Sequence, residues 1–273
     1  MTGTLFIVPT PIGNLEDMTL RGLRILREVQ LIAAEDTRTS RVLLKHYEIH
    51  TPMTSYHEHN KLGKIESIFD ALATGDVALI SDAGMPGISD PGYELVREAI
   101  ARGHRVEALP GASALTTALV GSGLPTDSFI YLGFLPRKKL TQVFEPLLDE
   151  RRTLVAFESP NRLNNALKAI RDVFGPERVV CVACEISKMF ENYQRGAVSD
   201  VLAYYEANNP RGEITLVIGG ASAEEQVWDE EQVRAALNEK LADGDSLSRA
   251  AKAVAAESGW KKKAVYALGI EDV

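Results

Sequence analysis

Short apolar runs alternate with helical patterns from about residue 4 to about residue 219, and this alternation restricts the possible folds more than any other feature. Regular alternation of strands and helices predicts α/β layers with a mostly parallel sheet, at least in the first half. The predicted strands are Leu5–Val8, Leu31–Ala34, Val77–Ile80, Arg105–Ala108, Ile130–Gly133, Thr153–Phe157, Arg178–Val182 and Ile214–Ile218. The predicted helices between them include Pro91–Arg102, Arg162–Val173 and Ser199–Ala207.

The pattern changes after Gly219-Gly220, where a small acidic stretch is followed by purely helical sequence. Three short helices with the look of a helix-turn-helix are predicted over Asp229–Leu241, Ser246–Glu257 and Lys261–Leu268. Asp229 and Ser246 suit helix N-caps, and Gly259 suits a helix end. We therefore expect an N-terminal α/β domain over residues 1–112, a C-terminal α/β domain over 113–222 and a helical appendage over 228–273.

The composition is that of an ordinary globular protein, with 273 residues, 45% hydrophobic residues and a net charge of −8. Because this acidic balance repels phosphate, any nucleic-acid binding has to come from local basic patches. The sequence shows neither a secretory leader nor an apolar run long enough for a bilayer, so we expect a cytoplasmic protein that is not bound to a membrane. Cys181 and Cys184 face opposite ways in a strand-like run, which predicts buried structural thiols and no metal site.

Three loops at strand ends stand out, and the first is Val8-Pro9-Thr10-Pro11-Ile12-Gly13-Asn14. Its two prolines each fix φ and remove a backbone donor, while Gly13 permits a conformation that other residues resist. A stiff loop at the carboxyl end of a first strand is where open α/β sheets bind ligands. An ordinary turn is the alternative for this loop taken alone, but two further loops of the same kind favour a ligand site.

The second loop runs from Ser81 to Gly92 between a predicted strand and a predicted helix. Asp82, just past the strand end, can accept hydrogen bonds from ribose hydroxyls or an ammonium group. Asp90 suits an N-cap, with Pro91 at the first helical position. The third loop ends at Ser113-Ala114, where Ser113 can cap a helix whose free amides would receive an anion such as a carboxylate.

Polar clusters beside these loops supply candidate acids, bases and cations. Glu35-Asp36-Thr37-Arg38 follows the second predicted strand, and from there Arg38, Arg41 and Lys45 fall on one helix face. Such a stripe can equally be a solvated face. Tyr56-His57-Glu58-His59-Asn60 suits a substrate-facing loop better than a metal site, because its His-Glu-His run lacks a chelate spacing. A helix cap is a further alternative for this cluster.

Together these segments resemble the class III, tetrapyrrole-methylase-like family of S-adenosylmethionine-dependent methyltransferases. The resemblance covers nearly the whole chain and rests on Val8–Asn14, Ala34–Arg38, Ser81–Gly84, Asp90–Gly92, Pro110-Gly111 with Ser113-Ala114, Gly133–Pro136, Phe157–Pro160 and Gly212–Val217. It implies two α/β domains with the donor in the cleft between them, and commonly a homodimer. The first loop lacks the Gly-Asp-Pro ending of the tetrapyrrole branch, which favours the branch that 2′-O-methylates a decoding-region cytidine ribose in 16S ribosomal RNA of the small subunit.

The resemblance also implies which residues hold the donor. Carried onto this sequence, they are Pro11, Ile12, Gly13, Ser81, Asp82, Ala83, Gly84, Ile88, Ser113, Ala114, Glu158, Ile214 and Thr215. Methyl transfer to a hydroxyl needs in-line positioning and benefits from an acceptor for the hydroxyl proton. Asp36 is our first candidate for that acceptor, followed by Glu35, His57 and Glu58, with Arg38 or Lys188 steering phosphates.

Three basic clusters are expected to contact RNA. They are Arg38, Arg41 and Lys45; Arg137, Lys138 and Lys139; and Lys261, Lys262 and Lys263. A solubilising turn is the alternative for the last cluster. Two other functions stay open, namely a tetrapyrrole methylase and a non-catalytic RNA-binding or assembly factor that kept the fold. Intact Gly13, Asp82, Gly84 and Gly111 argue against the non-catalytic factor.

Overall fold

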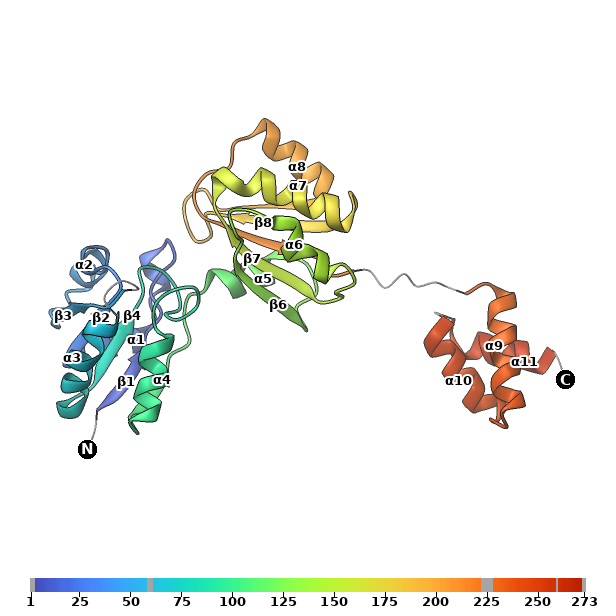
Figure 1. Ribbon diagram of the computed structural model, residues 1–273, viewed down its shortest axis with the longest axis horizontal. Coiled ribbons are helices and arrows are strands. Elements are labelled where there is room, and N and C mark those ends of the chain that lie inside the picture. Colours follow the sequence, from blue (N-terminus) through green and yellow to red (C-terminus); the bar gives the residue numbers. More distant parts are fainter. Residues whose placement is uncertain (1–2, 58–60, 222–227, 259, 272–273) are drawn as a thin grey trace. The chain divides into compact units, whose positions relative to one another are not determined.

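The computed structural model describes residues 3–57, 61–221, 228–258 and 260–271 (Figure 1). The chain separates into two compact units, Met1–Gly220 and Ala221–Val273, and the first unit contains two five-stranded sheets. These sheets confirm the α/β class that the alternating sequence pattern predicts. The boundary near residue 112 between two α/β domains stays a prediction.

The first sheet is wholly parallel, as predicted, with strand order β3-β2-β4-β1-β5. Its strands are β1 (Thr4–Ile7), β2 (Leu31–Ala34), β3 (Met53–Ser55), β4 (Val77–Ile80) and β5 (Arg105–Ala108). All four residues of β4 are buried, since helices cover both faces of the sheet. The carboxyl ends of all five strands therefore meet at one edge, and that edge carries the loops predicted to bind a ligand.

Two pairs of helices cover the two faces of this sheet. Helices α1 (Leu20–Glu28) and α2 (Thr37–His46) contribute Leu23, Leu26 and Leu44 to the apolar cluster on one face. Helices α3 (Lys61–Thr74) and α4 (Tyr93–Ala101) contribute to the cluster on the opposite face. A short 3-10 helix, η1 (Leu15–Asp17), precedes α1.

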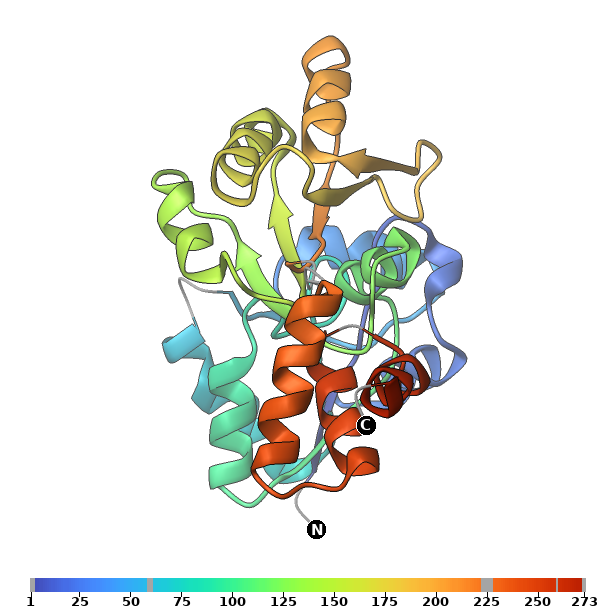
Figure 2. The same ribbon diagram turned by 90° about the vertical axis from the view of Figure 1, so that its right-hand side faces the viewer.

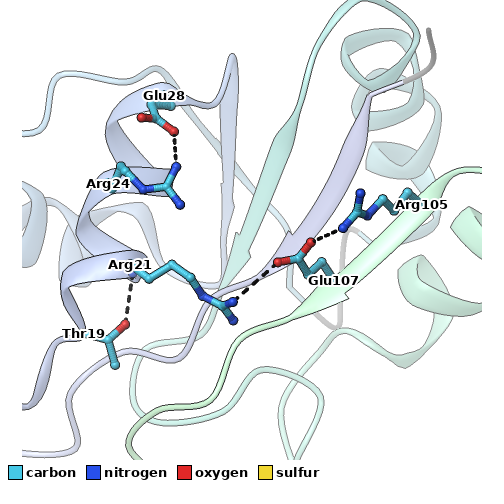
Figure 3. Close-up of polar contacts among 7 residues, drawn as sticks. Thr19, Arg21, Arg24, Glu28, Arg105 and Glu107 are labelled. Carbon is cyan, nitrogen blue, oxygen red and sulfur yellow. Dashed lines mark hydrogen bonds and ion pairs between the residues drawn. The ribbon is translucent and has the colours of Figure 1, made fainter.

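The start of α1 is fixed by Thr19, whose hydroxyl oxygen accepts the Gly22 N–H at 3.0 Å. Figure 3 shows Glu107 of β5 between two guanidinium groups, 2.8 Å from Arg105 and 3.7 Å from Arg21 of α1. The Arg21–Glu107 pair links α1 to the edge strand β5, whereas the Arg105–Glu107 pair lies within β5. These side chains are at least partly exposed, so both ion pairs add little stability.

The second sheet has strand order β6-β7-β10-β8-β9, in which only β6 and β7 are parallel. Its strands are β6 (Phe129–Phe134), β7 (Thr153–Glu158), β8 (Val179–Cys184), β9 (Asn192–Ala197) and β10 (Ile214–Ile218). Helices α6 (Leu140–Phe144), α7 (Leu163–Phe174) and α8 (Val198–Ala207) cover one face, and α5 (Ala114–Ser122) covers the other. Two short 3-10 helices lie in the connections of this sheet: η2 (Glu145–Leu147) follows α6, and η3 (Pro160–Arg162) precedes α7.

Cys181 and Cys184 of β8 are both free and buried, and they belong to apolar clusters on opposite faces of the second sheet. This matches the alternation expected of a strand. Among the described residues, no group of three or more His, Cys, Asp or Glu could hold a metal ion.

The second unit is a bundle of α9 (Glu230–Ala242), α10 (Leu247–Ser258) and α11 (Lys262–Glu271), drawn in orange to red in Figure 2. Asp229 caps α9 in a reciprocal capping box with Gln232, which confirms the predicted helix start. Val233, Leu237 and Val254 are fully buried in the core of the bundle. Gly259, the predicted helix end, lies outside the described residues. No helix in the described ranges is long and apolar enough to cross a membrane.

One predicted helix start is wrong. Asp90 is not an N-cap and Pro91 is not the first helical residue, because α4 begins at Tyr93 and its N-cap is Gly92. The preceding loop turns back on itself, with left-handed φ values of 85° at Gly87 and 64° at Ser89. A Cβ on Gly92 would lie 3.1 Å from the Gly87 backbone nitrogen, so the turn depends on that close approach. The fold thereby frees the Asp90 carboxyl from a capping role.

Candidate functional site

A cleft of about 370 Å³ lies where the carboxyl-end loops of the first sheet meet the second sheet. The first sheet contributes Ile12 after β1, Glu35 after β2 and the Asp82–Asp90 loop after β4. The second sheet contributes the ends of β6 and β7 and the start of β10. Ile12 also packs against the apolar cluster under α5, which ties the first loop to the second sheet.

Most of the residues predicted to hold the donor lie on the wall of this cleft. Those that line it are Ile12, Asp82, Ala83, Gly84, Ile88, Ser113, Ala114, Glu158, Ile214 and Thr215. Pro11 and Ser81 instead line a neighbouring cavity of about 250 Å³ that also reaches Asp82. Gly13 packs against Lys188, because a Cβ at Gly13 would lie 2.4 Å from the Lys188 Cγ.

An acidic edge runs along the strand ends of the first sheet. The Asp82 N–H donates to Glu35 Oε2 at 3.2 Å, and the Asp36 N–H donates to Asp82 Oδ1 at 3.1 Å. Burial raises the pKa of the Glu35 carboxyl, although the hydrogen bond from Asp82 opposes that rise. Burial also raises the pKa of Asp82. These bonds fix two carboxylates side by side at the mouth of a cleft that can attract a cation.

Asp90 is the most perturbed carboxyl of the cleft. Burial, followed by the negative charges of Glu35 and Asp82, raises its pKa to about 7. The adjacent Ser89 hydroxyl lies 2.7 Å from the hydroxyl of Tyr131 on β6, so the same loop is also bonded to the second sheet. Asp90 therefore changes its charge near neutral pH at the junction of the two sheets.

Glu158 ends β7 and presents a buried carboxyl to the cleft. Its Oε1 accepts the Ser159 N–H at 2.7 Å and pairs with Arg162 at 2.5 Å. Its Oε2 has no hydrogen-bond partner among the described residues. A buried carboxylate oxygen without a partner is rare in proteins and marks a place where a ligand donor can bind.

The start of α5 forms another part of the cleft wall. Ser113 occupies the N-cap position, as predicted, but its side chain makes no capping hydrogen bond. The predicted position of the N-cap is therefore confirmed, but the predicted capping by the Ser113 hydroxyl is wrong. Ser113 has an extended backbone, and its side chain leaves the first-turn amides of α5 uncapped. Uncapped amides at a helix start suit a carboxylate ligand.

The candidate catalytic residues divide into those on the cleft wall and those outside it. Glu35 lines the cleft, whereas Asp36, Arg38, His57 and Lys188 do not. Asp36 caps α2 by accepting the Arg38 N–H at 2.8 Å, and it pairs with the Arg38 guanidinium at 2.7 Å. These bonds from Arg38 lower the pKa of Asp36 to about 2.

Lys188 lies at the rim of the cleft. Its ammonium group donates to Glu185 at 2.9 Å and to the cleft residue Glu213 at 3.1 Å. His57 follows the fully buried Tyr56 beyond β3, and Glu58 lies outside the described residues.

The three predicted RNA-binding clusters are exposed and lie on three different segments of the chain. Arg38, Arg41 and Lys45 lie on α2, whereas Arg137, Lys138 and Lys139 lie between β6 and α6. Lys261, Lys262 and Lys263 lie at the start of α11 in the second unit, where Lys262 donates to Ser248 at 3.3 Å.

Sequence reasoning missed several residues of the cleft wall. They are Met85, Ser89, Phe134, Phe157, Ser159, Pro160, Gly212 and Glu213, together with Asp90, which was assigned to a helix cap. Most of them directly flank a residue or strand end that was predicted. Extending each group of predicted donor residues by two positions would have found all of them except Phe134.

Comparison with known proteins adds three curated relatives and a family. A model of the family described as Tetrapyrrole (Corrin/Porphyrin) Methylases matches residues 4–202. A protein named Ribosomal RNA small subunit methyltransferase I from Synechocystis sp. is 42% identical over 273 residues, which is 98% of each chain. Proteins of the same name from Halalkalibacterium halodurans and Thermotoga maritima are 42% and 48% identical over 97% and 80% of this chain, and over 93% and 99% of their own lengths.

Solved structures agree on the fold. A cobalt precorrin-4 methyltransferase superimposes with a TM-score of 0.59 at 17% identity, over 79% of this chain and 94% of its own. A putative diphthine synthase from Entamoeba histolytica gives a TM-score of 0.60 at 15% identity, over 81% of this chain and 94% of its own. At such identities the likeness concerns the fold alone.

Proposed function

Because the chain belongs to the tetrapyrrole methylase family, we propose that it is an S-adenosylmethionine-dependent methyltransferase that acts on 16S ribosomal RNA. The observation that carries this proposal is the relative from Synechocystis sp., which is 42% identical over 98% of both chains and is named for ribosomal RNA methylation. The acceptor atom that we propose is the 2′-hydroxyl of a cytidine ribose in the decoding region. Its partner is then the small ribosomal subunit, the protein works in the cytoplasm, and two copies of the chain form a homodimer.

The cleft is chemically suited to the donor. Its volume of about 370 Å³ falls within the range of small-molecule sites. S-adenosylmethionine carries a sulfonium and an ammonium cation, which the carboxylates of Glu35, Asp82 and Glu158 would attract. Its carboxylate would suit the amides at the start of α5, and its adenine would suit the apolar side chains of Ile12 and Ile88. All the donor-binding residues implied by the family resemblance are proposed in this role.

The reaction requires the ribose hydroxyl to be aligned with the methyl donor, and it requires an acceptor for the hydroxyl proton. The donor supplies a methyl group on a good leaving group, so the chain's main task is to hold the ribose oxygen in line. Among the proton acceptors proposed from sequence, Glu35 lines the cleft and has a raised pKa, which favours it as a general base. Asp36, held by Arg38 with a pKa of about 2, is a weaker base, and His57 and Glu58 remain further proposals.

RNA binding is proposed to rest on the exposed basic clusters on α2, between β6 and α6, and at the start of α11. With a net charge of −8, the protein lacks a global field that attracts free RNA. Small patches that match fixed phosphates suit a folded subunit better than an unstructured strand.

The test is transfer of labelled methyl from S-adenosylmethionine to small ribosomal subunits that lack the modification. We expect label on one cytidine of the decoding region, mapped by resistance of the neighbouring bond to alkaline cleavage. Donor binding without transfer to the subunit, but with transfer to a porphyrinoid, would refute the proposal in favour of a tetrapyrrole acceptor.

Two matched variants assign the base. Glu35→Gln should slow methyl transfer even at saturating donor and saturating subunit. Asp36→Asn should instead weaken the α2 N-cap and the pairing with Arg38, with a smaller effect on the rate of transfer. The reverse ranking would restore Asp36 as the first candidate.

A further inference from the structure

A bulge in β6 changes which way its last residues face. Tyr131 lies opposite Val155 of β7, but Phe134 lies opposite Phe157. Between these two pairs β6 advances by three residues while β7 advances by two. Gly133 lies in the bulge with a φ of 69°, a left-handed conformation that glycine adopts most readily. Bulges of this kind re-aim side chains and are common beside active sites.

The bulge moves Phe134 from the core face of the sheet to the cleft face. Ile130 and Leu132 pack on the core that α6, α7 and α8 cover, so regular alternation would place residue 134 there too. Instead Leu135 enters that core and is 2% exposed. Phe134 lies on the side of Tyr131, and both rings meet Phe157 edge-on with centroids 5.3 Å apart.

The result is an aromatic ring on the cleft wall that the protein itself does not cover. Phe134 lines the cleft and is 61% exposed, although a phenyl ring gains free energy when it leaves water. Its edge-on contact with Phe157 braces the ring from one side. A braced, exposed aromatic face is the feature that RNA-binding proteins use to stack an unpaired base.

Positive charge follows this ring directly along the chain. Arg137, Lys138 and Lys139 are all exposed, within five residues of Phe134, in a chain whose net charge is −8. Lys139 has a left-handed φ of 62°, and α6 starts at the next residue, so the short basic segment ends in a defined turn. Aromatic rings flanked by cations are typical of surfaces that bind single-stranded nucleic acid.

We propose that Phe134 stacks on a base of the acceptor RNA at the mouth of the donor cleft, while Arg137–Lys139 contact the phosphates beside that base. The inference rests on the proposed function and deepens it, because it names the side chain that holds the acceptor. The bound chemistry is a nucleobase, and the donor's adenine is the other source of one. The high exposure of the ring and the basic run beside it favour the acceptor.

The experiment compares Phe134→Ala, Phe134→Leu and Phe134→Trp in methyl transfer to unmodified small subunits, with the donor Kd measured separately. Loss of one stacked base should lower kcat/KM for the subunit on the order of tenfold, with the donor Kd unchanged. Phe134→Trp should retain most of the activity, whereas Phe134→Leu, which is apolar but has no π face, should resemble Phe134→Ala. Phe129→Ala is the matched control, because it removes a partly exposed phenyl ring from the other end of β6.

Each alternative outcome overturns the inference in its own way. Full activity of Phe134→Leu would show that the ring contributes only apolar packing and no stacking. A higher donor Kd in Phe134→Ala would show that the stacked base is the adenine of the donor. An equal loss in Phe129→Ala would indicate a general effect on the sheet. A wild-type protein that binds the donor but labels no ribosomal RNA refutes the proposed function itself, and this failure is distinguishable because it precedes any variant.

Discussion

Replacing Asp90 by asparagine should stabilise the protein above neutral pH and leave its stability in acid almost unchanged. The carboxyl has an ordinary pKa of 3.8 when unfolded and a pKa of about 7 in the folded cleft. Below the lower value both states are protonated, so burial carries no charge penalty. Between the two values the unfolded state has lost its proton while the folded state retains it, so wild-type stability falls as the pH rises. Above about pH 7 the penalty is complete.

The size of the effect follows from the shift. About three pH units at 1.36 kcal/mol each would correspond to roughly 4 kcal/mol. Asp90 is only half-buried and accepts a hydrogen bond from Ser81, so solvent screening and the loss of that bond reduce the gain. We expect the asparagine variant to be more stable by about 1–2 kcal/mol near pH 8 and by less than about 0.5 kcal/mol near pH 4.

The assay is urea unfolding followed by far-ultraviolet circular dichroism at the two pH values. Tryptophan fluorescence is unsuitable, because Trp228 and Trp260 both belong to the helical second unit. Asp127→Asn is the matched control, since Asp127 is exposed and its replacement should change stability by less than about 0.5 kcal/mol at either pH. Equal stability of wild type and Asp90→Asn near pH 8, or an equal gain at both pH values, would refute the reasoning.

Three further predictions follow from the same contacts. Since a cationic donor favours the ionised form of Asp90, donor affinity of the wild type should rise with pH through about 7 in calorimetric titrations, and Asp90→Asn should lack that rise. Arg162→Met should destabilise the protein by about 3 kcal/mol in urea unfolding, because it leaves the buried Glu158 carboxylate without its ion-pair partner. Adding Glu158→Gln should restore most of the lost stability, and strictly additive losses in the double variant would contradict this. Burial raises the pKa of the Cys184 thiol, and that of Cys181 to about 11, so iodoacetamide should label neither thiol until urea unfolds the chain, as read by mass spectrometry.

The central strands of the fold were predictable because they are buried on both faces. Such strands appear in the sequence as continuous apolar runs, and Leu31–Ala34 and Val77–Ile80 were predicted with the bounds observed. The two strands that were missed, β3 (Met53–Ser55) and β9 (Asn192–Ala197), each lie at the edge of a sheet. An edge strand is short or polar because only one side is paired, so its sequence resembles a loop.

The cleft was predictable only in part, for a related reason. Prolines and glycines mark the loops after β1 and β4, and the uncapped start of α5 follows a Pro-Gly pair. The orientation of Phe134, in contrast, depends on the register of β6 against β7, and register is a property of two strands that no single segment encodes. Asp90 was misassigned because Asp-Pro is a common helix start, whereas the glycine contact that delays α4 is tertiary.

The position of β1 in the first sheet has a consequence for folding during synthesis. Strand β1 lies between β4 and β5, which are both synthesised after it, and its Leu5 pairs with Val77 and Val106. At typical elongation rates those partners are synthesised roughly 4–20 seconds later. During that interval an apolar strand with two unpaired edges is exposed, which makes this segment a natural client for a chaperone at the exit tunnel. For a protein proposed to modify ribosomes, the strand order of its first sheet thus links its own folding to the rate at which ribosomes elongate its chain.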